Sequence, residues 1–244
     1  MSGSEKQHRG DTRAHGSERA RVAAFFDVDG TLLSCQSGTL YIGFLRRQGL
    51  MDLSDQLRIY WAFLTYRLGM LNMRRLADVT SRWLEGREER EVIEHCREWY
   101  MTEVSRYFRE CVLDRVREHR DAGHAVALLT GGTHYLNDLI AEELGLEHVL
   151  ASQLEVVEGR FTGKPHGPLC YGRGKLTYAE RFAAEHGVSL EQSYFYTDSI
   201  TDLPMLQRVG NPVAVCPDPR LRREARSRGW PILDAPAAAT SRAA

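Results

Sequence analysis

The sequence has no long hydrophobic run: none of its apolar stretches reaches the roughly 20 residues that a membrane-spanning helix needs. Its five cysteines are scattered and none forms a CxxC pair, which argues against a disulfide framework or a structural zinc site. Reduced thiols in a cytoplasmic protein are the expectation. The first 20 residues lack the apolar core of a secretory signal. The formal net charge is only −1, so the overall charge of the protein provides no electrostatic attraction to nucleic acid.

Four short apolar runs, each ended by polar or turn-forming residues, predict buried strands of a parallel sheet. The runs are residues 22–26, 125–129, 194–196 and 212–215. Helical patterns separate most of them, and strands that alternate with helices favour an α/β fold with a mainly parallel sheet. Residues 154–162 predict a hairpin that turns at Glu158-Gly159.

Residues 37–111 differ from the rest of the chain. They contain no proline and little strand signal, and leucine, methionine, arginine and glutamate recur in helical patterns such as residues 73–84 and 88–108. We therefore expect an all-helical insertion that covers one end of the sheet. The expected division is a discontinuous core of residues 21–36 and 112–234, a helical cap of residues 37–111, and flexible tails at residues 1–20 and 235–244.

Within the insertion, residues 57–71 are apolar nearly all round the predicted helix. Burial within the cap, or in a contact between two copies of the chain, explains such a segment. The alternatives are that the segment forms the apolar lining of a pocket, or that it contacts a membrane surface. Three arginines in this region could bind a substrate carboxylate or a second phosphate: Arg67, Arg74 and Arg75.

Acidic and hydroxyl side chains follow the apolar runs at the points where these end. They are Asp27 and Asp29 after the first run, Thr130 with Gly131 after the second, and Asp198 and Asp202 after a later one. Because the carboxyl ends of parallel strands share one edge of the sheet, where ligands bind, these groups should converge. Several carboxylates in one crevice repel one another, and a hard cation such as Mg²⁺ relieves that repulsion. The backbone N–H groups that follow Thr130 enter a helix and suit a phosphate.

These motifs resemble those of the haloacid dehalogenase superfamily, and within it the phosphoserine-phosphatase-like branch, over residues 21–234. DVDGTL at residues 27–32 matches the first motif, and LLTG at 128–131 is similar to the second. Lys175 occupies the place of the third, and TDSITD at 197–202 resembles the fourth. The resemblance implies a Rossmann-like core with a helical cap, and hydrolysis of a small phosphorylated metabolite.

The resemblance also implies a role for each matched residue. Asp27 is implied as the nucleophile that forms an aspartyl-phosphate, and as a Mg²⁺ ligand. Asp29 is implied as the general acid and base, with its carbonyl on Mg²⁺. Thr130, Gly131 and Lys175 are implied to hold the phosphoryl group.

Two aspartates of the fourth motif complete the implied site. Asp198 would ligate Mg²⁺, and Asp202 would orient the metal shell or the lysine of the third motif. This motif has Thr201 where the family commonly has Asn. Phosphoserine enzymes of the branch carry a Glu shortly after the first motif, and Gln36 is the equivalent place counted without gaps. A neutral amide binds an ammonium less well, which disfavours phosphoserine and leaves histidinol phosphate or another monoester open.

Several alternatives stay open at this point. Lys164 is a rival to Lys175, which is favoured because it opens a helix. His134 and His166 lie close to motif segments, where we expect surface or hydrogen-bonding roles. A phosphotransferase with an alcohol as acceptor would use the same intermediate. A non-catalytic binding protein on a phosphatase scaffold should have lost one of the acidic residues, and all are present.

Overall fold

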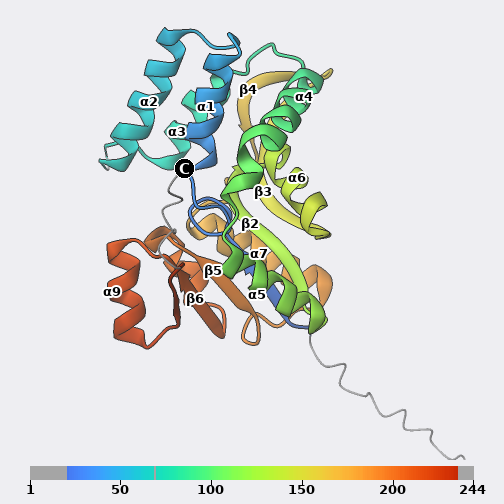
Figure 1. The fold of residues 1–244 in the computed structure, drawn as a ribbon, viewed down its shortest axis with the longest axis vertical. Helices are drawn as coiled ribbons and strands as arrows, with labels where there is room; N and C mark the ends of the chain where they lie inside the picture. Colours follow the sequence, from blue (N-terminus) through green and yellow to red (C-terminus); the bar gives the residue numbers. More distant parts are fainter. Residues whose placement is uncertain (1–20, 69, 236–244) are drawn as a thin grey trace, which may run out of the picture.

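The computed structural model describes residues 21–68 and 70–235, and a seven-stranded sheet forms its centre (Figure 1). The tails expected at residues 1–20 and 235–244 lie outside the described residues, except for residue 235. The strand order is β4-β3-β2-β1-β5-β6-β7, and only the pair of β3 with β4 is antiparallel. The strands are β1 (Ala23–Phe26), β2 (Ala125–Thr133), β3 (His148–Val157), β4 (Arg160–His166), β5 (Tyr194–Thr197), β6 (Asn211–Val215) and β7 (Ile232–Leu233).

The four apolar runs predicted as strands are β1, β2, β5 and β6, so the α/β class with a mainly parallel sheet is confirmed. The hairpin is confirmed as well, since β3 and β4 are joined at Glu158 and Gly159. Its first strand is longer than predicted, because it begins at His148 and its first half pairs in parallel with β2. The two-residue β7 is too short to leave a pattern in the sequence.

The strand β1 is buried on both faces of the sheet, and all four of its side chains are buried. Successive side chains of a strand point to opposite faces. Phe25 therefore packs edge-on against Phe182, with ring centroids 5.7 Å apart, while Phe26 stacks on Tyr196 at 4.5 Å. Helices cover both faces: α7 (Arg173–His186), α8 (Leu203–Leu206) and α9 (Pro219–Arg228) contribute to the core of Phe25, and α5 (Glu110–Asp121) and α6 (His134–Leu144) to that of Phe26.

The chain between β1 and α5 is helical, as predicted (Figure 1). Its α-helices are α1 (Ser37–Arg47), α2 (Leu53–Arg67), α3 (Met73–Arg82) and α4 (Glu89–Trp99). The helical pattern predicted over residues 88–108 is helical as far as Tyr107, but it is not one regular α-helix: α4 ends at Trp99, and a π-helical turn (Tyr100–Val104) and a 3-10 turn (Ser105–Tyr107) follow. Phe108 leaves helical geometry because it bridges to Leu33, and this tertiary pairing overrides local helix propensity.

Two stretches of chain connect the helical segment to the core, and they are hydrogen-bonded to each other. The amide of Ser34 donates to the carbonyl of Tyr107 at 2.8 Å, and the amide of Arg109 donates to the carbonyl of Leu32 at 2.9 Å. This pair of bonds forms a neck between the helical segment and the core. We retain as a proposal the division into a core and a cap at the predicted bounds.

A second set of backbone hydrogen bonds ties the segment to the β3–β4 hairpin. The amide of Gly86 donates to the carbonyl of Phe161 at 2.8 Å, and the amide of Phe161 donates to Arg87 at 3.0 Å. The amide of Glu89 donates to Gly159 at 2.9 Å. The helical segment is therefore tied to the edge of the sheet at the start of α4, as well as to the core at the neck.

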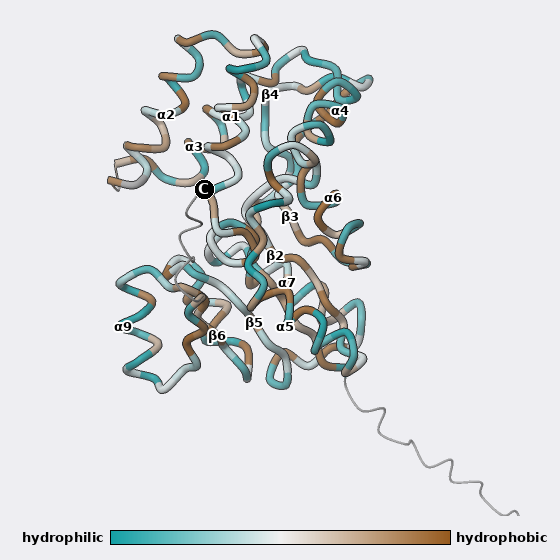
Figure 2. The backbone as a smooth tube through the Cα atoms, in the orientation of Figure 1, coloured by the Kyte–Doolittle hydropathy of each residue, from teal (hydrophilic) through white to brown (hydrophobic). Residues whose placement is uncertain are grey.

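Helix α2 lies at the outer edge of the molecule, and hydrophobic residues recur along its length (Figure 1, Figure 2). Burial within the cap, the first of the explanations for residues 57–71, holds for only one side of the helix. Ile59 and Ala62 are buried, whereas Leu57 and Trp61 are 58% and 66% exposed. The reason is that α2 turns only one side toward α1 and α3, while its apolar residues occupy two sides. Within residues 21–68 and 70–235, no helix is both long and apolar enough to cross a membrane.

Two histidines make stability depend on pH: His119, which is buried near the end of α5, and His124, which is partly buried and follows that helix. Nε2 of His119 lies 2.9 Å from the hydroxyl of Tyr196, and its Nδ1 lies 2.8 Å from Nδ1 of His124. Burial, with help from His124 and Arg115, lowers the pKa of His119 from 6.5 to about 4. Between these values the unfolded chain binds a proton that the folded protein excludes, so stability falls as the pH falls from 6.5 toward 4.

We expect the His119→Gln variant to lack this part of the acid sensitivity. At about pH 5 the wild-type protein should have lost about 2 kcal/mol of unfolding free energy through His119, relative to about pH 7. Urea unfolding of both proteins at the two pH values measures the difference. An equal loss in the variant and the wild type would contradict the assignment.

Candidate active site

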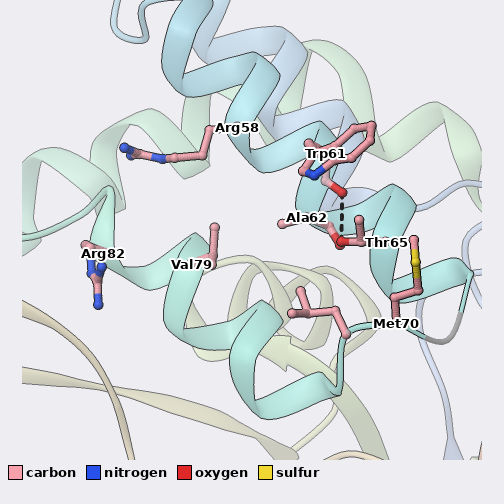
Figure 3. Close-up of a pocket in the computed structure, with 8 residues that line it drawn as sticks. Arg58, Trp61, Ala62, Thr65, Met70, Val79 and Arg82 are labelled. Carbon is pink, nitrogen blue, oxygen red and sulfur yellow. Dashed lines mark hydrogen bonds between the residues drawn. The ribbon is translucent and has the colours of Figure 1, made fainter.

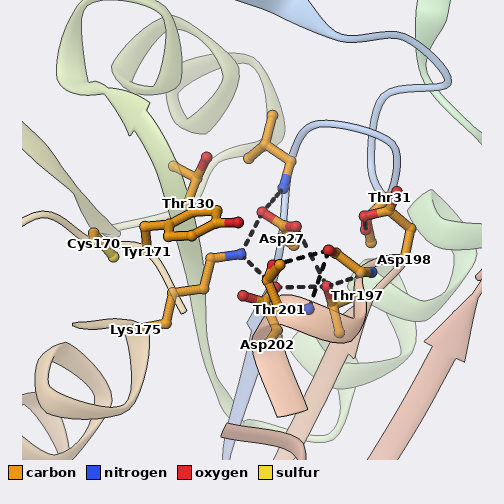
Figure 4. Close-up of polar contacts among 12 residues, drawn as sticks. Asp27, Thr31, Thr130, Cys170, Tyr171, Lys175, Thr197, Asp198, Thr201 and Asp202 are labelled. Carbon is orange, nitrogen blue, oxygen red and sulfur yellow. Dashed lines mark hydrogen bonds and ion pairs between the residues drawn. The ribbon is translucent and has the colours of Figure 1, made fainter. Parts of the chain in front are cut away.

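Asp27 lies at the carboxyl end of β1, in the middle of the sheet, and is only 6% exposed. Its amide donates to the carbonyl of Tyr196 at 2.9 Å, which continues the β1–β5 ladder. Its Oδ1 accepts from the amide of Val28 at 2.8 Å and lies 2.8 Å from Nζ of Lys175 (Figure 4). Its Oδ2 is 3.4 Å from the hydroxyl of Thr197 and is less engaged. One oxygen of this carboxylate is therefore held while the other stays available.

Lys175 lies in the first turn of α7 and is only 2% exposed. Besides Asp27, its Nζ contacts Oδ2 of Asp202 at 2.7 Å, and the same oxygen accepts from the hydroxyl of Thr197 at 2.7 Å. Burial disfavours the charged lysine, but the two carboxylates outweigh burial and raise its pKa. Lys164, its rival in the sequence, is exposed on β4 and takes no part in these contacts.

Asp198 follows β5 and lies beside the turn of the first motif (Figure 4). Its Oδ1 accepts from the hydroxyl of Thr31 at 3.3 Å. Gly30 has a φ of +77°, and a Cβ at that position would lie 2.3 Å from Oδ2 of Asp198. Only glycine satisfies both the backbone conformation and this close approach. The structure thus brings the carboxylates of Asp27, Asp198 and Asp202 into one cluster (Figure 4).

Asp218 is a residue of this site that the sequence did not reveal. Its amide donates to the carbonyl of Asp198 at 2.8 Å, and its Oδ2 accepts from the amide of Ile200 at 2.7 Å. Its other oxygen caps α9 by accepting from Arg220 and Leu221. An Asp before a helix predicts a cap, but nothing in the sequence indicates that the same side chain holds the loop of the fourth motif.

The end of β2 supplies the groups predicted to bind phosphate. Thr130 is buried, and its hydroxyl accepts from the amide of Gly132 at 3.1 Å. A Cβ on Gly131 would lie 3.6 Å from the ring of Tyr171, so this glycine faces the loop that precedes α7. The hydroxyls of Tyr171 and Tyr66 contact each other, and this contact links α2 to the same loop.

Asp29 is turned toward the helical segment. Its Oδ1 accepts from the amide of Ser37, the first residue of α1, at 2.7 Å. Burial raises the pKa of Asp29, and the bond from Ser37 opposes that rise. A carboxyl that is protonated more readily than usual is suited to donate a proton to a leaving group.

The cluster carries more negative than positive charge. Burial raises the pKa of Asp27 from 3.8 to about 7; Lys175 opposes this rise, and repulsion from Asp202 and Asp198 adds to it. Burial likewise raises the pKa of Asp198 to about 6. Within the part of the chain that the structure describes, Oδ1 of Asp202 is buried and has no hydrogen-bond partner.

These features fit a hard divalent cation. Two carboxylates with raised pKa values, Asp27 and Asp198, flank the turn that holds the backbone of Asp29. Among residues 21–68 and 70–235, no three His, Cys, Asp or Glu side chains are grouped as a metal site. A Mg²⁺ site does not need such a group, because Mg²⁺ takes one or two carboxylates and completes its shell with carbonyl oxygen, water and phosphate.

Other candidates from the sequence lie away from the cluster. His134 pairs with Asp138 one turn along α6, at 3.0 Å, and His166 is exposed at the end of β4. Arg74 pairs with Asp78 at 3.7 Å on α3. Arg75 is exposed on α3, and the side chain of Arg67 lies outside what the structure describes. The side chains of His134, His166, Arg74 and Arg75 make no hydrogen bond or ion pair with the aspartate cluster.

A family model described as haloacid dehalogenase-like hydrolase matches residues 24–207. The chain is 34% identical over 222 residues to a protein of Mycobacterium tuberculosis named a probable phosphatase, covering 88% of this chain and 76% of that protein. It is also 34% identical to a phosphoserine phosphatase of M. tuberculosis (87% and 70% covered). A histidinol-phosphatase of Neisseria meningitidis is 29% identical (86% and 97% covered).

Solved structures share the fold. A protein of unknown function from Bordetella pertussis superposes with a TM-score of 0.82 at 31% identity, over 88% of this chain and 99% of that one. A phosphoserine phosphatase that carries an analogue of the phospho-aspartyl intermediate superposes with a TM-score of 0.65 at 22% identity, over 88% and 94%. The second likeness concerns the fold alone.

Proposed function

The chain belongs to the haloacid dehalogenase-like hydrolases and is a phosphatase of that family, and from this premise we propose that it hydrolyses a small phosphomonoester through an aspartyl-phosphate on Asp27, with Mg²⁺ bound. The observation that carries the proposal is the placement of Asp27. Its carboxylate is buried at the carboxyl edge of the sheet, with Oδ1 held 2.8 Å from Nζ of Lys175 and Asp29 two residues away.

In the first step, the less engaged oxygen of Asp27, Oδ2, attacks phosphorus while the bond to the leaving oxygen breaks. Asp29 gives its proton to that oxygen, so the alcohol leaves neutral. In the second step Asp29, now a carboxylate, takes a proton from water, and the water oxygen attacks phosphorus. The bond to Asp27 breaks, phosphate is released, and both aspartates return to their starting states.

The remaining groups bind and orient the phosphoryl group. Lys175 keeps its positive charge because two carboxylates raise its pKa, so it can attract phosphoryl oxygens as well as fix Asp27. The hydroxyl of Thr130 and the amide of Gly131 lie at the end of the neighbouring strand. Asp202 holds Lys175 in place at 2.7 Å, and the burial of Asp27, Lys175 and Asp202 keeps bulk water away from these charges.

Asp27, Asp198 and the carbonyl of Asp29 would hold the Mg²⁺ ion. When bound, the cation neutralises negative charge on the transferring oxygens and on the carboxylates. We expect hydrolysis of an aryl phosphate to fall at least about a hundredfold in excess chelator and to return when Mg²⁺ is restored. Full activity in excess chelator would remove the metal from the proposal.

The substrate is proposed to be a small phosphorylated metabolite, since relatives include a phosphoserine phosphatase and a histidinol-phosphatase. Gln36 is exposed and lies immediately before α1. The next residue, Ser37, donates its amide hydrogen to Oδ1 of Asp29. The side chain of Gln36 is a neutral amide, which supports the proposal that the substrate has no ammonium group next to this residue.

A panel of phosphomonoesters tests the choice of substrate, and phosphoserine should be a poor member of it. The Gln36→Glu variant should raise kcat/KM for phosphoserine roughly fivefold, the worth of one partly exposed ion pair, and leave an aryl phosphate unchanged. Phosphoserine as the best substrate of the wild-type protein would contradict this prediction.

A further inference from the structure

The outer side of α2 carries a stripe of large apolar side chains. Each is between 37% and 66% exposed, and spacings of three or four residues place them on one side of the helix. The stripe consists of Leu53, Leu57, Tyr60, Trp61, Leu64 and Leu68. The opposite side of the same helix, with Ile59 and Ala62, is buried. The stripe is therefore a second apolar face, which packing within the described chain does not use.

A groove of about 390 Å³ runs between this helix and α3. Trp61, Met70 and Val79 contribute apolar surface to it, and Arg58 and Arg82 line it as well. The two arginines lie toward one end of the groove, and Trp61 and Met70 toward the other (Figure 3). Arg58 has Asp55 as a neighbour at 2.9 Å, while Arg82 has no carboxylate within 4 Å among the residues described. The groove thus joins apolar surface to cationic groups.

The charge of this part of the chain differs from that of the rest. Residues 37–84 hold seven arginines and three aspartates, with no lysine and no glutamate, so their formal charge is seven minus three, or +4. The whole chain has a formal charge of −1. The positive charge is therefore concentrated in the segment that also exposes the apolar stripe.

We infer that α2 and α3 form a docking surface for a lipid bilayer with anionic headgroups. The stripe, with Trp61 near its middle, enters the boundary between headgroups and acyl chains, where amphipathic helices of this kind lie. Arg58 and Arg82 meet lipid phosphates at the edge of the stripe, and long arginine side chains can reach them from an apolar surface. A second copy of the chain is the poorer occupant, because two segments of charge +4 would face each other.

Sedimentation with lipid vesicles tests this inference on the full chain. We expect the wild-type protein to bind vesicles of phosphatidylcholine with about 30% phosphatidylglycerol, and to bind pure phosphatidylcholine at least roughly tenfold less. A Leu57→Asp, Trp61→Asp variant should bind the anionic vesicles at least roughly tenfold less than the wild type. Val157→Asp is the matched control, since Val157 is 57% exposed on the β3–β4 hairpin and lies outside the stripe.

Two further measurements separate the bilayer from other occupants. Tryptophan emission should shift to shorter wavelength on vesicle binding, and Trp61→Phe should abolish the shift while sedimentation persists. Arg58→Gln with Arg82→Gln should weaken binding to anionic vesicles and leave hydrolysis of a soluble aryl phosphate unchanged, which also shows that the variant is folded. Wild-type protein that stays in the supernatant with anionic vesicles overturns the inference. A wild-type dimer that Trp61→Asp converts to a monomer, without vesicle binding, assigns the stripe to a second copy and overturns it too.

Discussion

Asp27→Asn is expected to abolish turnover and, at the same time, to stabilise the metal-free protein. The amide keeps the size of the carboxylate but cannot form an acyl phosphate, so kcat should fall by at least about four orders of magnitude. Steady-state hydrolysis of an aryl phosphate measures this fall. A rate near that of the wild type would remove Asp27 as the nucleophile.

The gain in stability follows from the direction of the pKa shift. Folding raises the pKa of Asp27 from 3.8 to about 7, so between these values the folded state binds a proton that the unfolded chain has released. Stability then falls as the pH rises from 3.8 toward 7, by about 2–4 kcal/mol through this group. The variant has no such group and should unfold at higher urea concentration near neutral pH in chelator.

The matched control is Asp138→Asn. The carboxylate of Asp138 is 61% exposed on α6 and pairs only with His134 within the described chain. Its loss should change unfolding free energy by less than about 0.5 kcal/mol and leave turnover intact. If Asp27→Asn lost activity and also lost stability, misfolding rather than missing chemistry would explain the result.

Lys175→Met is expected to be the most destabilising change at the site. It leaves Asp27 and Asp202 buried without the cation that both contact, at 2.8 and 2.7 Å. Removing one partner of a buried ion pair costs about 3–5 kcal/mol. The cost should be smaller at about pH 5 than above pH 7. Asp27 has a pKa of about 7 and is protonated at pH 5 even beside the lysine, so only Asp202 is then left without its cation.

Urea unfolding at two pH values measures this dependence, and Lys164→Met provides the control. Lys164 is exposed on β4, so its replacement should change unfolding free energy by less than about 0.5 kcal/mol at either pH. Turnover should fall by about two to three orders of magnitude in Lys175→Met and stay unchanged in the control. Equal stability of the two variants at neutral pH would contradict the role of Lys175 in balancing the carboxylates.

The sheet and its central carboxylates were predictable because their signals are local. The apolar run of β1 ends at Asp27 and that of β5 ends just before Asp198, and parallel strands necessarily bring such ends to one edge. The prediction of Lys175 over Lys164 was weaker, because in the sequence both lysines lie in the polar region between the predicted hairpin and the next predicted strand. Burial at the start of α7 decides it, and burial is a property of the folded chain.

Other features depend on contacts between distant segments and could not be predicted. Asp218 serves the loop after β5 from the start of α9, through a contact that leaves no pattern in the sequence. The hydrophobicity of α2 was visible, but which of its two apolar sides faces the neighbouring helices depends on how α1 and α3 pack. The end of the helical stretch at Phe108 likewise follows from the pairing of this residue with Leu33.

The neck formed by Ser34 with Tyr107 and by Leu32 with Arg109 has an evolutionary consequence. The two ends of a long insertion are held side by side, so they could be joined by a few residues without rethreading the sheet. Segments of another length or shape could be grafted onto the same two ends, because loop closure adds little cost when the ends are already adjacent. Recognition of new compounds can then diversify above a reaction centre that stays the same.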